Sequence, residues 1–156
     1  MKKLLSVLAV LFVLGTVNVF AIGVGPQGGW NPALKGGNGA LSLKLDNVPC
    51  YFAVSATFQD PIIIGLTADW WIKNPKIEGT WGYYYGVGGA GAVTLGSDVA
   101  TIFVGGRALI GTNVKLLDNF IEIYLQAAWE PGIAIHNGVV PVFNYFPIDL
   151  GLRFWF

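Results

Sequence analysis

Few side chains in this sequence could do acid–base or nucleophilic chemistry. His136 is the single histidine, and it falls in a Pro/Gly-rich stretch, while Ser97 and Asp98 occupy a neighbouring stretch. These three residue types are those of a hydrolase or acyltransferase site, but the serine lacks a nucleophile motif and nothing fixes the geometry. We therefore interpret His136 as an exposed loop residue. The sequence predicts no catalysis, no cofactor and no metal site.

The segment Gly86 to Gly91 reads G-x-G-x-x-G, the spacing of a dinucleotide-binding turn. Such a turn binds phosphate only where it connects a strand to the N-terminus of a helix. No helix-forming stretch follows it here. We interpret the glycines as strand residues that permit curvature and leave room for bulky facing side chains such as Tyr84 and Phe103.

Charged residues are more informative, because they recur at alternate positions of otherwise apolar stretches. Three are positive and three are negative: Lys44, Asp69, Arg107, Glu122, Asp149 and Arg153. The set is too small to solubilise an exterior, but its balance suits a closed interior, where charges persist only in pairs. We predict a lumenal ion-pair network with Arg107 and Arg153 against the carboxylates. The alternative is charge scattered over a surface.

The composition indicates what encloses these charges. The chain is 54% hydrophobic and 12% charged, whereas soluble domains typically carry about 25% charged residues. After Ala21, however, no segment stays apolar for the 18 or more residues of a membrane helix. A closed barrel resolves the conflict, because it satisfies its backbone hydrogen bonds internally and requires only alternating hydrophobicity.

Alternation with a period of two runs through the chain, as in Leu41–Leu45 and 120–130, and helical periodicity is absent after residue 21. Turn residues such as 46–49 and 74–76 separate the alternating segments. The fold class predicted is all-β, an eight-stranded antiparallel up-and-down transmembrane β-barrel. Its approximate strands are 22–30, 38–46, 50–59, 62–73, 79–93, 99–111, 119–130 and 142–156, with short loops at 31–37, 60–61, 94–98 and 131–141.

The N-terminus reads as a cleaved signal peptide over residues 1–21, which leaves 22–156 as the barrel. Lys2 and Lys3 precede an apolar run of about 11 residues, too short for the roughly 20 of a membrane anchor. Cleavage leaves seven of nine positive residues against nine negative ones, a net charge of −2, which argues against nucleic acid as a partner. Cys50 is the only cysteine and cannot form an internal disulfide.

The C-terminal octad 149–156 places Leu150, Leu152, Phe154 and Phe156 on one strand face and Asp149, Gly151, Arg153 and Trp155 on the other. It resembles the β-signal read by the outer-membrane assembly machinery, with Asp149, Gly151, Phe154 and Phe156 at the matching positions. The whole pattern resembles small eight-stranded outer-membrane barrels of the OmpA, OmpX and OmpW kind, and short spirochaete barrels. This resemblance implies an outer-membrane location, lipid, periplasmic chaperones and the assembly machinery as partners, and a monomer.

Aromatic residues gather towards strand ends, as in the girdles at both interfaces of membrane barrels. The predicted girdle comprises Trp30, Trp70, Trp81, Tyr83, Trp129, Phe154 and Phe156. With periplasmic termini, one rim would gather Tyr51, Trp70, Trp71, Trp81, Tyr83, Phe120, Phe154 and Phe156. The other rim would gather Trp30, Phe58, Trp129, Phe143 and Phe146.

These patterns predict a non-enzymatic outer-membrane barrel with a structural or surface-interaction role. Three alternatives stay open: a narrow channel or uptake barrel for small hydrophobic ligands, a secreted lipocalin-like binding barrel, and a lipid-modifying enzyme. A wide pore is excluded, because eight strands enclose only enough space for their own side chains.

Overall fold

The computed structural model describes residues 21–96 and 100–156, so the predicted signal peptide lies outside it except for Ala21. A helix with the length and apolar character of a membrane span is absent from these two ranges. The regular structure consists of β1 (Ile22–Trp30), β2 (Gly37–Leu45), β3 (Cys50–Thr57), β4 (Ile62–Lys73), β5 (Lys76–Glu78), β6 (Trp81–Leu95), β7 (Ile102–Leu116), β8 (Ile121–Trp129), β9 (Gly132–Ile135), β10 (Val139–Val142) and β11 (Ile148–Trp155).

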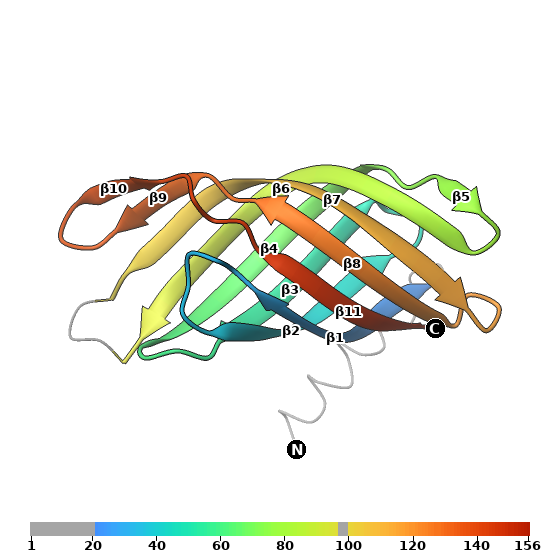
Figure 1. Ribbon diagram of the computed structural model, residues 1–156, viewed down its shortest axis with the longest axis horizontal. Helices are drawn as coiled ribbons and strands as arrows, with labels where there is room; N and C mark the ends of the chain where they lie inside the picture. The colour runs from blue at the N-terminus through green and yellow to red at the C-terminus, as the bar shows by residue number, and fades with distance from the viewer. Residues whose placement is uncertain (1–20, 97–99) are drawn as a thin grey trace, which may run out of the picture.

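Eight of these strands close into an antiparallel barrel, which confirms the predicted fold class (Figure 1). The order around the barrel is β1, β2, β3, β4, β6, β7, β8 and β11, and β11 pairs with β1 to close the ring. The terminal backbone completes the seam, since Ile22 and Phe156 exchange hydrogen bonds of 3.0 and 3.1 Å. Closure leaves no barrel strand with an unpaired edge, as a backbone surrounded by lipid requires.

The two ends of the barrel differ. One end, here the terminal end, carries the start of β1, the C-terminus and the connections at 46–49, 74–80 and 117–120. The opposite end, here the loop end, carries the connections at 31–36 and 58–61, and the longer segment between β8 and β11. In that segment β9 and β10 form a hairpin that lies beside β7 at the loop end (Figure 1).

Three predicted boundaries were wrong. The strand predicted at 99–111 is β7, which continues to Leu116, because its last residues pair with the start of β8. The following turn is tight, with positive φ at three successive residues from Leu117 to Asn119. The last strand begins at Ile148 and not at 142, and the predicted loop at 131–141 contains β9 and most of β10.

Burial follows the period of two along the barrel strands. In β8, Glu122, Tyr124, Gln126 and Ala128 are buried, while Ile123, Leu125, Ala127 and Trp129 are exposed. Alternation of this kind is what a pleated strand produces when its two faces meet different surroundings. The enclosed core is therefore the polar and aromatic face, and the aliphatic face points outward.

Two interior tyrosines lie flat over glycines of the neighbouring strand. Tyr84 on β6 pairs with Gly111 on β7, and Tyr124 on β8 pairs with Gly151 on β11. A Cβ at either glycine would overlap the tyrosine ring. The glycines therefore make the space that the rings occupy. The sequence interpretation gave this role to the glycines of 86–91, but the glycine beneath Tyr84 is Gly111 of the neighbouring strand.

Gly111→Ala is accordingly expected to destabilise the barrel by about 1–3 kcal/mol, the usual cost of forcing an extra methyl group into a packed interior. The ring cannot move aside easily, since Tyr84 also stacks on Trp71 at 3.7 Å between ring centroids. Gly106→Ala on the same strand is the matched control, because nothing lies within 4 Å of its Cβ position. Urea unfolding in detergent micelles would measure both, and equal effects would contradict this packing.

Candidate functional site

All six charged residues singled out from the sequence are buried within the barrel. They divide into two groups. Arg153 and Glu122 pair in one group, whereas Arg107, Asp69 and Asp149 form the other. Lys44 is buried but belongs to none of the salt bridges formed by residues 21–96 and 100–156. Its Nζ instead donates to the carbonyl of Leu45 at 3.2 Å and lies 4.6 Å above the Trp71 ring.

The terminal half of the lumen is filled by an aromatic plug, which we define as Tyr51, Trp71, Tyr84 and Tyr124. Trp71 stacks on Tyr84 with an interplanar angle of 8°. Tyr51 stands between Trp71 and Tyr124, with its ring centroid 6.3 Å from each of theirs. The Arg153 guanidinium lies 3.8 Å above the Tyr124 ring. This stacking is a cation–π contact in a site closed to solvent.

Glu122 anchors the polar contacts of the plug. Its carboxylate accepts from Arg153 Nη1 at 3.2 Å, from Trp155 Nε1 at 3.0 Å and from Asn113 Nδ2 at 2.6 Å. The three donors come from β11 and β7, which flank β8 on either side. Both members of the Glu122–Arg153 pair are fully buried. The Glu122 carboxylate is thus well supplied with donors, whereas Arg153 Nε and Nη2 have no hydrogen-bond partner in the described residues and lie against the rings of the plug.

Arg107 organises the second group, nearer the loop end. Its Nε donates to Asp69 Oδ2 at 3.0 Å, Nη1 donates to Glu130, and Nη2 lies 3.8 Å from Asp149 Oδ2. Asp149 also accepts from Gln126 Nε2 at 3.3 Å. The sequence reasoning did not include Glu130 in this network. The signal was present, because Glu130 continues the alternating face that carries Glu122.

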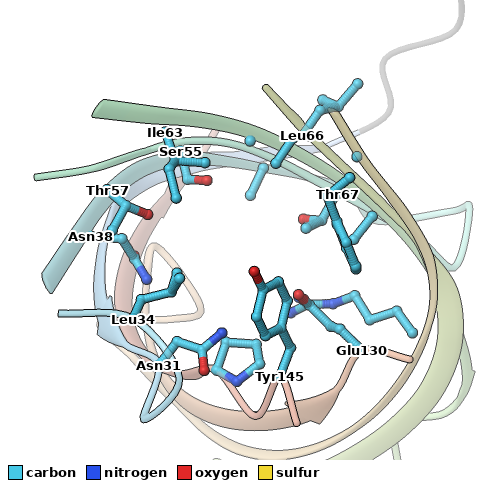
Figure 2. Close-up of a pocket in the computed structure, with 18 of the residues that line it drawn as sticks. Asn31, Leu34, Asn38, Ser55, Thr57, Ile63, Leu66, Thr67, Glu130 and Tyr145 are labelled. Carbon is cyan, nitrogen blue, oxygen red and sulfur yellow. The ribbon is translucent and has the colours of Figure 1, made fainter. Parts of the chain in front are cut away.

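A cavity of about 120 Å³ lies beyond the Arg107 group at the loop end. This is roughly ten times the space that one water molecule requires. Asn38, Thr67, Glu130 and Tyr145 project into it from different parts of the barrel wall (Figure 2). Partial burial raises the pKa of the Tyr145 phenol, so this hydroxyl stays a hydrogen-bond donor at neutral pH. The arrangement could hold water or a small polar molecule.

The structure places the other predicted residues as follows. All members of the predicted girdle have an exposed or partly exposed side chain: Trp30, Trp70, Trp81, Tyr83, Trp129, Phe154 and Phe156. Tyr51 and Trp71, which the sequence analysis put on the same rim, point into the lumen instead. Each directly neighbours an outward-facing residue in the sequence, and successive side chains of a strand point to opposite faces. Within the C-terminal octad, Asp149, Gly151, Arg153 and Trp155 are buried.

Of the residues considered for catalysis, the structure places His136 alone. Ser97 and Asp98 lie outside the described residues. His136 is exposed at the tip of the β9–β10 hairpin, with Nδ1 3.0 Å from the Thr101 hydroxyl. Within the described ranges, no group of three or more His, Cys, Asp or Glu side chains could hold a metal ion.

The fold and lumen define a class: a closed eight-stranded antiparallel β-barrel with an ionic and aromatic interior and an aliphatic exterior. Among solved structures, the chain is similar to Neisserial surface protein A, with a TM-score of 0.52 and 18% sequence identity. The match covers 88% of this chain and 97% of that one. At this identity the likeness concerns the fold alone. No protein-family model matches the chain, and no curated protein does.

Proposed function

We propose that the protein is an integral outer-membrane β-barrel with periplasmic termini and a structural or surface-interaction role without catalysis. The observation that carries this proposal is the inverted distribution of polarity. Large aliphatic side chains are exposed on the barrel exterior, among them Leu41, Val54, Leu66, Ile110, Leu125 and Leu150. An apolar surface of this extent is incompatible with a water-exposed monomer and suits contact with lipid.

The same distribution argues against a secreted lipocalin-like barrel. Such a barrel would keep an apolar ligand site inside and a charged surface outside. Here Arg153 and Glu122 are fully enclosed, whereas aliphatic residues such as Val54 and Ile110 face outward. The C-terminal octad fits the same proposal as an assembly signal, since its strand β11 supplies the seam that closes the barrel on β1.

The proposal includes a closed lumen. From the terminal end towards the loop end, the Arg153–Glu122 pair, the aromatic plug and the Arg107 group follow one another in the barrel interior, and their members are buried. Rings stacked at 3.7 Å leave no water between them. The cavity at the loop end is therefore closed at its inner end by the Arg107 group, and this closure argues against a channel.

Planar-bilayer recordings test this closed lumen. The purified wild-type barrel is expected to give no steady openings. A variant that carries both Trp71→Ala and Tyr84→Ala is expected to conduct, because it removes the two stacked rings, and it also controls for insertion. Steady openings of the wild-type protein with the same conductance as this variant would contradict the proposal and favour the narrow-channel alternative.

A further inference from the structure

The segment between β8 and β11 has an unusual composition for a connection outside a barrel. Between Glu130 and Asp149 the chain contains no Asp, Glu, Lys or Arg. Within it, β9 and β10 pair as a hairpin whose exposed side chains include Ile133, Ile135 and Val139. A hairpin bathed in water would expose an apolar patch without any charge to solubilise it.

The strand register joins this patch to the barrel wall. Ile135 pairs with Ile102 of β7 and with Val139 of β10, and Ile133 pairs with Val104. Partners in an antiparallel ladder project from the same face of the sheet. Ile102 and Val104 are exposed on the barrel exterior. The outward face of the hairpin is therefore a lateral continuation of the lipid-facing wall and not a separate surface.

The height of the hairpin matches the far side of a bilayer. On β7, Val114 pairs with the girdle residue Trp81 at the terminal end, and Ile102 pairs with Ile135 at the loop end. At the usual rise of about 3.4 Å per residue and a tilt of about 40°, these two levels lie roughly 30 Å apart along the barrel axis. The apolar band of an outer-membrane barrel is about 25 Å tall and the hydrocarbon core of an average bilayer is about 30 Å thick, so the hairpin lies at the outer boundary of the acyl chains.

Below the hairpin, an apolar groove of about 430 Å³ continues the same surface. It is lined by side chains of β7, β8 and the segment that returns to β11, including Ala108, Ala127, Trp129 and Phe146. Trp129 is fixed there, because its Nε1 donates to the Phe143 carbonyl at 2.9 Å. No charged residue interrupts the surface from this groove to the hairpin.

We propose that the outward face of the β9–β10 hairpin is immersed in the outer leaflet, where lipid acyl chains cover Ile133, Ile135 and Val139. The inference rests on the proposed membrane insertion. Acyl chains are the occupant that the observations favour, because the hairpin continues a lipid-covered wall at the height of the leaflet. The hairpin is thus a membrane-interacting element that makes the barrel wall taller on the β7 side.

Site-specific labelling tests this inference on the folded, full-length mature barrel. In a Cys50→Ala background, Val139→Cys would be labelled with the environment-sensitive fluorophore NBD and reconstituted in phosphatidylcholine vesicles. Val87→Cys, midway along the lipid-facing wall, is the control for lipid contact. Lys35→Cys, in the β1–β2 connection, is the control for water. Heat-modifiable gel migration verifies that each labelled barrel is folded.

The label at position 139 is expected to show blue-shifted emission and to be quenched by lipids brominated near the carbonyl end of the acyl chain. This quenching should be as strong as that of the label at position 87 by lipids brominated near the chain end. Iodide should quench only the label at position 35. Iodide quenching at 139 would overturn the inference, as would protection from both quenchers, which indicates a protein partner such as a second copy. If position 87 also escapes the brominated lipids, the proposed membrane insertion itself fails.

Discussion

Glu122→Gln is expected to lower the free energy of unfolding by about 3–5 kcal/mol, the largest effect of a single substitution in the lumen. The substitution keeps the shape of the side chain but leaves the Arg153 guanidinium without its counter-charge. Arg153 is fully buried, and its salt bridge within the described residues is to Glu122. The cost arises because a charge that is removed from water and has no partner is strongly disfavoured.

Equilibrium unfolding in urea, followed by tryptophan fluorescence, would measure this loss. The double variant Glu122→Gln with Arg153→Met is the control, because it removes both charges and should recover much of the stability. Glu78→Gln, on the exposed strand β5, should have little effect. A Glu122→Gln barrel as stable as the wild type would show that the pair is not enclosed.

Val87→Arg is expected to destabilise the barrel in lipid vesicles by about 2–4 kcal/mol, the cost of placing arginine on the lipid face near the bilayer midplane. Val87 on β6 is 50% exposed on the exterior and pairs with Ala108, which lies midway between Val114 and Ile102 on β7. The cost comes from contact of the guanidinium with hydrocarbon, so it depends on depth and not on the substitution alone.

Leu116→Arg is the matched control for depth. Leu116 is also exposed, but it is the last residue of β7, beside the turn at the terminal end. Its expected cost is about 0–1 kcal/mol, the value near an interface. Guanidinium unfolding of both variants in the same vesicles would measure the difference. Equal costs at the two positions would contradict the proposed position of the bilayer.

The faces of the strands could be predicted from the sequence because a period of two is a local property. The alternation in 149–156 assigns Arg153 and Trp155 to one side and Phe154 to the other, and the structure buries the first two and leaves Phe154 partly exposed. The same rule separates Trp70 from Trp71. The number of barrel strands could also be predicted, because turn residues divide the chain into alternating segments of suitable length.

Partner choice inside the lumen could not be predicted in the same way. Which side chains meet there depends on the register and stagger of strands that are distant in sequence. Arg107 thus contacts Glu130, which the sequence analysis had omitted, and Lys44 contacts a tryptophan ring where a carboxylate was expected. The β9–β10 hairpin was interpreted as a loop because Pro131, Gly132 and Pro141 lie in short strands that a local pattern does not separate from turns.

The central claim is that the aliphatic face of each strand contacts lipid while the polar and aromatic face is enclosed. Trp70 and Trp71 test it most directly, because they are adjacent on β4, yet Trp70 is 52% exposed and Trp71 only 3%. Two variants would each retain one of these tryptophans, with the other five replaced by phenylalanine. The measurement is the ratio of fluorescence in brominated and unbrominated lipid vesicles. Our account predicts strong quenching of Trp70 and almost none of Trp71. Quenching of Trp71 as strong as that of Trp70, or of neither, would contradict it.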